Sequence, residues 1–324
     1  MNTPSFFSKA VALAPMAGVA DSSFRTIAME CGASYSVSEM ISTKAIVFGN
    51  ENTLKLIHHT EKEKPFGIQL FGNNPNDFTK ASQVVFNDYS CDFIDINMGC
   101  PAPKIVKTGA GSALMNSVTL AVDIVRAVVE SVNVPVTVKI RSGFSKEDRN
   151  AVSFALAIEE AGASAVTIHG RSREMMYKPP VDYEIIRDVV QVLSIPVIAN
   201  GDIFSYSDYL KMREITGCSS VMIGRGSLGN PYIFSEINAR NSGTEYIAPT
   251  LSERLQTLRR QVALAIEVKG EAFALIEARK HAAWYIKGLR GASLLRSKAF
   301  GISNLDDLDS FIEMTLSFAE VHRV

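Results

Sequence analysis

The chain has 324 residues, with 33 lysines and arginines against 34 acidic residues and a formal net charge of −1. Apolar residues make up 47% of it and charged residues 21%, which excludes a disordered, collagen-like or coiled-coil protein. A chain of this length buries about 75% of its unfolded surface, so it needs no disulfide or metal to fold. The balanced charge excludes binding to nucleic acid through bulk charge alone but leaves room for a local basic patch.

The four cysteines, Cys31, Cys91, Cys100 and Cys218, form no Cys-x-x-Cys pair. Because this spacing is typical neither of zinc sites nor of disulfide scaffolds, we expect no metal site and a reducing, cytoplasmic location. No apolar run reaches the ~18 residues of a membrane helix. We interpret the apolar stretch near the N-terminus as part of the fold rather than a signal peptide. We expect neither a membrane nor an obligatory protein partner.

Eight short runs rich in β-branched residues recur in the first two thirds of the chain, and amphipathic stretches separate most of them. Strands that alternate with helices indicate βαβ units and a parallel sheet. Eight units in about 230 residues favour a (β/α)8 barrel, and nearly continuous apolar strands suggest a sheet covered on both faces. The expected strands are 11–15, 34–39, 66–72, 92–99, 134–141, 164–171, 195–202 and 219–226, and the expected helices include 120–132, 150–160, 183–192 and 207–213.

The pattern changes after about residue 238. Residues 238–250 are polar, contain Gly and Pro, and predict a linker, and the chain from Leu251 onward has no strand-like run. We therefore predict a barrel domain over residues 1–240 and a helical domain over residues 248–324. The predicted C-terminal helices lie near 251–268, 271–288 and 305–321. In the barrel, we expect Asp21 or Ser22 to cap the N-terminus of the first helix, and Ser207 to cap the helix that follows the seventh strand.

Polar residues gather at the ends of the last two predicted barrel strands. Asn200, Gly201 and Asp202 follow the seventh strand, and Gly224 and Arg225 follow the eighth. Loops at these positions of a barrel commonly bind phosphate through backbone N–H groups, and glycine lets the backbone approach an anion. Each motif alone is also explained by a tight turn without a ligand. Their combination on adjacent strands favours phosphate binding, with arginine as a charged partner.

Gln69, Lys139 and His169 end the third, fifth and sixth strands and are expected to converge. A flat heteroaromatic cofactor needs hydrogen-bond donors along one edge, and a lysine stabilises negative charge on a reduced ring, so a flavin is the natural candidate. A solvated lysine and a structural histidine are the alternatives, although a lysine within an apolar strand is costly to bury unpaired. Cys100 directly follows the fourth strand, where it is either a reactive group or an inert buried thiol.

Motifs in a fixed order carry these residues: APMAGVADSSFR, SEMIS, QLFG, DINMGCPAPKIVKTGAGSALM, VTVKIR, TIHGRSR, VIANGDI and MIGRGSLGNPYIF. They run from about residue 10 to residue 237, and ARKHAAWY at 278–285 continues the series. Together they resemble the motifs of the tRNA-dihydrouridine synthase family. The forms DINMGCPAPK and ARKHAAWY are most similar to its bacterial DusB-like branch.

The resemblance implies an FMN enzyme that uses NADPH to reduce a uridine of tRNA to 5,6-dihydrouridine. Hydride would pass from flavin N5 to uracil C6, and Cys100 would give a proton to C5, because a thiol pKa near ~8.5 keeps it protonated. Asn97 would bond the uracil edge of a base that has left the RNA stack. The implied cofactor-binding residues are Pro15, Met16, Ala17, Gln69, Lys139, His169, Asn200, Gly201, Asp202, Gly224 and Arg225.

Residues 277–300 hold six cations, Arg279, Lys280, Lys287, Arg290, Arg296 and Lys298, against one acid, Glu277. Offsets of 8 and 3 place Arg279, Lys287 and Arg290 on one face of a continuous helix. Such a strip can bind phosphates and orient a folded RNA, and Arg171 and Arg173 at the barrel mouth would extend it. A merely solvated helix face is the alternative.

Two other functions are compatible with parts of this pattern. An FMN barrel of the dihydroorotate dehydrogenase or old yellow enzyme kind would share the phosphate site and Lys139, but it would not need a basic helical domain. An RNA-binding barrel without chemistry would not need Cys100, Lys139 and His169 together.

Overall fold

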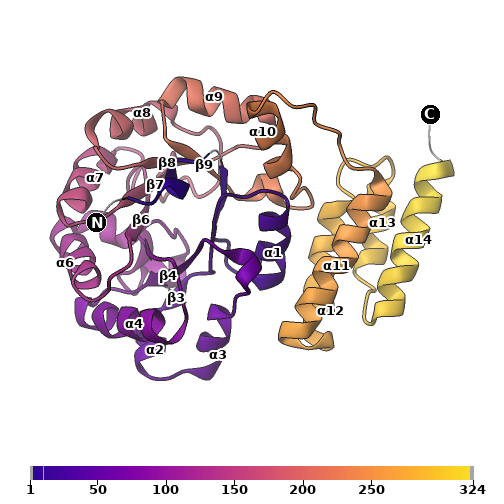
Figure 1. Cartoon of the computed structure of the whole chain (residues 1–324), viewed down its shortest axis with the longest axis horizontal. Helices are drawn as coiled ribbons and strands as arrows, with labels where there is room; N and C mark the ends of the chain where they lie inside the picture. The colour runs from indigo at the N-terminus through magenta and orange to yellow at the C-terminus, as the bar shows by residue number, and fades with distance from the viewer. Residues whose placement is uncertain (1–2, 10, 322–324) are drawn as a thin grey trace.

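Parallel strands in the computed structural model, which describes residues 3–9 and 11–321, form a ring enclosed by helices (Figure 1). The neighbour order is β1-β9-β8-β7-β6-β5-β4-β2, and β3 also pairs with β4. Two backbone bonds close the ring: Leu13 N–H donates to the Tyr35 carbonyl over 3.2 Å and Ser34 N–H to the Val11 carbonyl over 2.7 Å. The predicted (β/α)8 barrel is confirmed. The strands are β1 (Val11–Leu13), β2 (Ser36–Val37), β3 (Ile41–Ser42), β4 (Phe66–Phe71), β5 (Phe93–Asn97), β6 (Val136–Arg141), β7 (Ala165–His169), β8 (Val197–Asn200) and β9 (Ser220–Ile223).

The predicted second strand is interrupted. β2 ends at Val37, and the chain pairs with β4 again only at β3. Between them, the Ser38 hydroxyl accepts the Gln69 N–H over 2.9 Å, in the place of a backbone carbonyl. A side-chain oxygen thus replaces one backbone acceptor between the two strands. The alternation of apolar residues along a strand does not predict such a replacement.

Helices follow most strands and cover the outside of the ring (Figure 1). Asp21 caps the first of them, accepting the Phe24 N–H over 2.9 Å. The prediction of Ser207 as a cap is wrong, because Ser205 holds that position and accepts the Asp208 N–H over 3.2 Å. The barrel helices are α1 (Ser22–Glu30), α2 (Thr43–Val47), α3 (Glu51–Leu54), α4 (Pro75–Asp88), α5 (Pro103–Val106), α6 (Val118–Val129), α7 (Ala151–Glu160), α8 (Tyr183–Val192), α9 (Tyr206–Thr216) and α10 (Ile233–Asn241).

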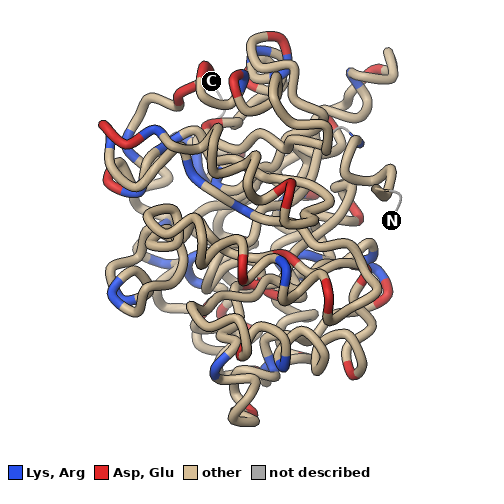
Figure 2. The backbone as a smooth tube through the Cα atoms, turned by 90° about the vertical axis from the view of Figure 1, so that its left-hand side faces the viewer, with Lys and Arg blue, Asp and Glu red and all other residues tan. Residues whose placement is uncertain are grey.

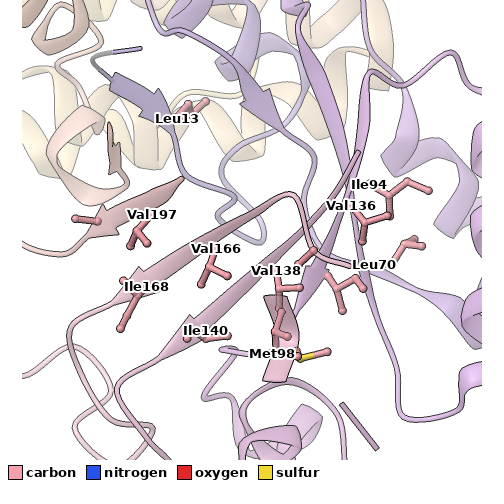
Figure 3. Close-up of a cluster of buried hydrophobic side chains, with 14 of the residues drawn as sticks. Leu13, Leu70, Ile94, Met98, Val136, Val138, Ile140, Val166, Ile168 and Val197 are labelled. Carbon is pink, nitrogen blue, oxygen red and sulfur yellow. The ribbon is translucent and has the colours of Figure 1, made fainter. Parts of the chain in front are cut away.

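Side chains alternate between the two faces of each strand, which divides the core into two clusters. One face packs against the helices, as for Ile94, Val138 and Val166 (Figure 3). The other face lies inside the ring and forms a separate cluster, in which Phe7 meets Tyr35 and Phe93 edge-on at centroid distances of 5.5 and 5.1 Å. Phe7 belongs to a short 3-10 turn, Ser5–Ser8, and is only 1% exposed. These rings fill the interior beside the first residues of the strands.

Four helices follow the barrel and share a core of their own, built around residues such as Leu255, Leu275 and Leu308. The predicted linker begins too early, because α10 continues to Asn241. α12 ends three residues before the predicted position, and α13 was not predicted. The helices are α11 (Leu251–Lys269), α12 (Glu271–Tyr285), α13 (Ala292–Ala299) and α14 (Leu305–Val321).

The C-terminal helices dock against α1 (Figure 1). Arg260 pairs with Glu30, and Lys269 Nζ lies 2.6 Å from the Asp21 carboxylate. Lys280 donates to the carbonyl of Gly18, in the loop after β1. Charges of both signs are interspersed along the backbone (Figure 2). Within the described residues, no helix is long and apolar enough to cross a membrane.

Candidate active site

A cavity of about 440 Å³ opens at the C-terminal ends of the barrel strands. Its lining comes from the ends of strands on both sides of the ring and from the loops that follow them. Residues that the sequence analysis did not assign to a site, including Arg141 and Tyr177, also line it. The predicted residues that the structure brings together here are Pro15, Met16, Ala17, Gln69, Asn97, Cys100, Lys139, His169, Asn200, Gly201, Asp202, Gly224 and Arg225.

One end of the cavity is a cradle of backbone N–H groups after β8 and β9. In the part of the chain that the structure describes, the N–H groups of Gly201, Asp202, Arg225 and Gly226 have no protein hydrogen-bond partner. A Cβ atom at Gly226 would lie 2.0 Å from the Ile203 carbonyl oxygen, so only glycine fits this turn. Neighbouring backbone N–H groups that have no protein partner suit an anion.

Two arginines, Arg225 and Arg171, lie beside this cradle and share the carboxylate of Asp202. Arg225 Nη2 lies 2.9 Å from the Asp202 carboxylate, which also pairs with Arg171. The Arg225 guanidinium stacks near the rings of Tyr177 and Phe204, with its Cζ atom 5.2 and 5.8 Å from their centroids. The aromatic faces and the carboxylate hold the guanidinium at the cavity rim, where it can meet an anion.

Lys139 projects into the middle of the cavity from β6. Its Nζ donates to Asn200 Oδ1 over 3.0 Å, and Asn200 Nδ2 in turn donates to the Met222 carbonyl over 2.7 Å. The second bond fixes the amide so that its oxygen faces the lysine. Burial, together with the neighbouring Arg141 charge, lowers the pKa of Lys139 to about 8. The ammonium is therefore close to its titration point at neutral pH.

His169 is buried beside four cations. Arg171 Nη1 lies 3.2 Å from His169 Nε2, and because a guanidinium only donates, Nε2 accepts and Nδ1 carries the ring proton. Burial lowers the pKa of His169 well below its usual value, and the nearby Arg141, Lys139 and Arg171 charges lower it further. The ring is neutral at physiological pH and offers a single donor.

Cys100 lies at the opposite side of the cavity, with its backbone held from two directions. Its N–H donates to Asn97 Oδ1 over 2.8 Å, and its carbonyl accepts from the Ser112 N–H over 3.1 Å and the Ser112 hydroxyl over 2.9 Å. Burial raises the pKa of the Cys100 thiol, so the thiol stays protonated at neutral pH. A positioned, protonated thiol can act as an acid.

The predicted role of Asn97 differs from its observed contacts. Its Oδ1 accepts the N–H groups of Gly99 and Cys100, and its Nδ2 donates to Gln69 Oε1 over 2.8 Å. Both ends of the carboxamide therefore have partners within the protein. The side chain lines the cavity, and its oxygen bonds the Cys100 loop. Its contact with a uracil stays a prediction.

Two arginines of the barrel are buried and bind the loops around the cavity. Arg171 is 0% exposed and bonds to the Lys178 carbonyl, so the prediction that it extends a surface strip is wrong. Arg141 donates to the carbonyls of Gly99, Ser172 and Met176 over 2.7 to 3.0 Å. Arg141 lies two residues after the inward-facing Lys139, so the strand alternation places it at the barrel mouth as well.

The predicted basic strip is not one helix face. α12 ends at Tyr285, so Lys287 and Arg290 lie in the following turn, where both are exposed. Arg279 is half-buried and donates to the Ile302 carbonyl over 2.8 Å. Arg173 is half-buried too, with its guanidinium 5.3 Å from the centroid of Phe144. Within the described residues, Lys287 and Arg290 are the exposed members of the predicted set.

Comparison with known proteins shows the family of this chain. The family model described as dihydrouridine synthase (Dus) matches residues 12–320. The chain belongs to the dihydrouridine synthase family. It is 38% identical to "tRNA-dihydrouridine synthase B" of Pasteurella multocida over 310 residues, 94% of this chain and 93% of that protein. It is 40% identical to the Shewanella oneidensis protein of the same name over 276 residues, 85% of each chain.

A solved structure of histamine dehydrogenase from Rhizobium sp. 4-9 shares the fold, with a TM-score of 0.55 at 11% identity. The match covers 79% of this chain and 49% of that one, so this dihydrouridine synthase chain spans about half of its length. At this identity the likeness concerns the barrel architecture alone.

The neutral state of His169 is testable by NMR of the purified protein with labelled histidine. Because burial and the adjacent cations disfavour the imidazolium, we expect the His169 ring signals to show the Nδ1–H tautomer and no titration between pH 8 and 5.5. A His169→Gln variant assigns the signals, and protein unfolded in urea gives the reference titration at about 6.5. Titration of the native signal in that reference range would contradict this assignment.

Proposed function

We propose that this dihydrouridine synthase reduces uridines of tRNA to 5,6-dihydrouridine, with FMN bound in the cavity and NADPH as the reductant. The observation that carries the proposal is the pairing of an anion cradle and a protonated thiol, Cys100, across one cavity at the mouth of the barrel. The relatives named tRNA-dihydrouridine synthase B support the substrate class.

The residues of the cavity fit an FMN. The free N–H groups after β8 and β9, together with Arg225, would hold the phosphate, which matches the donor chemistry of that end. Pro15, Met16 and Ala17 would lie against the ring, and Gln69, Lys139 and His169 would meet its polar edge. When bound, FMN supplies a hydride to C6 of the uracil.

The protein's own part in the reaction is the proton. Addition of a hydride at C6 leaves C5 in need of H⁺, and the Cys100 thiol would supply it. Burial keeps the thiol protonated until that moment, and the bonds from Asn97 and Ser112 fix the backbone from which it projects. Lys139 and Arg141 place positive charge on the same side of the barrel, which favours negative charge developing in the cavity.

The helical domain, 248–324, would bind the tRNA body. Lys287 and Arg290 are exposed and, within the described residues, take part in no ion pair, whereas Arg259 and Arg260 are paired with Asp309 and Glu30. Unpaired cations are the ones available to phosphates. The contacts of Lys269 and Lys280 with the barrel keep this domain next to the loop after β1, which lines the cavity.

Arg225→Ala should weaken FMN retention. The variant removes one charge-assisted contact with the phosphate, which corresponds to about 1.5–3 kcal/mol, or roughly 10- to 150-fold in dissociation constant. Fluorescence titration of the apoprotein with FMN measures the change. Lys211→Ala, an exposed cation on α9, is the matched control and should bind FMN like the wild type. Equal affinity in both variants would place the phosphate elsewhere.

Cys100→Ala should keep FMN and NADPH oxidation but lose dihydrouridine formation by about 10²–10⁴-fold, because only product formation needs a proton at C5. Rapid-mixing kinetics of the reductive and oxidative half-reactions separate the two steps. Cys31→Ala, at the end of α1 and away from the cavity lining, is the control for cysteine loss. Undiminished tRNA turnover in Cys100→Ala would assign the proton to another group.

Replacing both Lys287 and Arg290 by Ala should weaken tRNA binding and reduce the log–log salt slope by up to about one unit per lost phosphate contact. FMN content and NADPH oxidation should not change, because those depend on the barrel. A matched pair, Lys80 and Arg126, is exposed on α4 and α6, on the side of the barrel away from the helical domain (Figure 1). Salt titrations that coincide for the two double variants would exclude the turn as a tRNA contact.

A further inference from the structure

We propose that Asp95, inside the barrel, is a positioning residue: it sets the direction of a chain of side-chain hydrogen bonds through Gln69 and Asn97 and thereby fixes the loop that carries Cys100. The catalytic meaning of this inference rests on the proposed function. The hydrogen-bond chain itself does not, and it can be tested without substrate.

The strand register brings the chain together. Gln69 on β4, Asp95 on β5 and Thr137 on β6 are directly paired neighbours, so their side chains meet inside the ring. Gln69 Nε2 donates to Asp95 Oδ2 over 2.6 Å, and the Thr137 hydroxyl donates to Asp95 Oδ1 over 2.6 Å. Asn97 lies two residues after Asp95 and so faces the same interior.

The direction of each bond follows from the carboxylate. An ionised carboxylate only accepts, so Gln69 must turn its NH2 group toward Asp95 and its oxygen toward Asn97. Asn97 then donates from Nδ2 over 2.8 Å, and its oxygen faces the loop. The two halves of an amide are nearly alike in shape, so hydrogen bonding, rather than packing, decides which way each amide is turned.

The loop needs an acceptor at this point. Asn97 Oδ1 receives the N–H groups of Gly99 over 3.2 Å and of Cys100 over 2.8 Å. On the other side, Ser112 holds the Cys100 carbonyl, and a Cβ at Gly111, where φ is +61°, would lie 2.9 Å from that oxygen. With the Asn97 amide reversed, its NH2 group would face two N–H donors. The Gly99 and Cys100 N–H groups would then lose their acceptor, and only Ser112 would still bond to Cys100.

Asp95 is in the required state at neutral pH. It is 4% exposed, and burial raises its pKa to about 6, an effect opposed by the bonds from Gln69 and Thr137 and by the charge of Lys139. The Gln69 NH2 group keeps a second hydrogen that Asp95 does not use. The orientation of the Gln69 amide therefore has two effects: it fixes the Cys100 loop through Asn97, and it leaves one N–H donor on Gln69, which lines the cavity.

Exchanging the side chains of positions 95 and 97 tests the donor-to-acceptor direction of these hydrogen bonds. Asp95→Asn gives position 95 donors of its own, so Gln69 and Asn97 are free to reverse. Asn97→Asp keeps an acceptor for the loop but cannot donate to Gln69. In the double variant, the new amide donates to Gln69, Gln69 donates to the new carboxylate, and that carboxylate accepts from the loop. Net charge and composition equal those of the wild type. The bonds from position 95 to Gln69 and from Gln69 to position 97 run the other way, while the loop N–H groups still donate to position 97.

Residue-resolved hydrogen exchange of the Gly99 and Cys100 amides in the FMN-loaded protein is the readout. We expect Asp95→Asn to speed this exchange about tenfold or more, the double variant to return it to within about threefold of wild type, and Thr137→Val, which leaves the chain to Cys100 intact, to change it little. Unchanged exchange in a folded Asp95→Asn would overturn the proposal. If Asp95→Asn does not fold, a double variant that stays unfolded or unprotected overturns it as well.

The readout also separates this inference from the proposed function. If the amides respond as expected but the wild type forms no dihydrouridine in tRNA, only the function fails. If dihydrouridine forms and the double variant restores no protection, the function stands, and Asp95 acts through its charge or packing rather than through the direction of the bonds.

Discussion

Closure of the parallel ring is the constraint on which the rest of the molecule depends. Once Leu13 bonds to Tyr35 and Ser34 to Val11 across the gap between the first two strands, every strand has one face toward the helices and one toward the interior. The outward face can only be apolar. The inward face is filled by Phe7, Tyr35 and Phe93 beside the strand starts, whereas the cavity opens at the strand ends.

Polar groups placed in that interior must then satisfy one another, and this requirement shapes the site. Asp95 binds Gln69 and Thr137, Lys139 binds Asn200, and the buried Arg141 and Arg171 bond to backbone carbonyls of the rim loops. A buried guanidinium without such partners would be costly. Each of these bonds also fixes a wall of the cavity. The same hydrogen bonds therefore satisfy the buried polar groups and preorganise the site.

Strand positions and the gathering of polar residues at strand ends could be read from the sequence, because both follow from periodicity and local composition. Contacts between elements could not. The Ser38 hydroxyl interrupts a strand by bonding to β4, and Arg171 has the sequence context of a surface cation although it is buried and bonds to the Lys178 carbonyl and Asp202. Asn97 was expected to face a base, and its bonds to Gln69 and the Cys100 loop depend on the register of β4 and β5. The early end of α12 and the start of α13 have a local signal instead, because Gly288 and Gly291 adopt positive φ angles of 88° and 73° between the two helices.

The loop after β1 links the two parts of the chain. The Gly18 carbonyl accepts from Lys280 of α12, its N–H donates to Glu39, and the preceding residues line the cavity. Lys269 adds a second contact at Asp21, the cap of α1, where burial alone would raise the carboxyl pKa but the adjacent ammonium lowers it instead. A substrate that contacts both the barrel and the C-terminal helices therefore binds a surface whose two parts are joined next to the cavity. The helical domain is thus held by the same loop that forms part of the cavity wall, so a change at this contact acts on the position of the helical domain without replacing a group of the cavity.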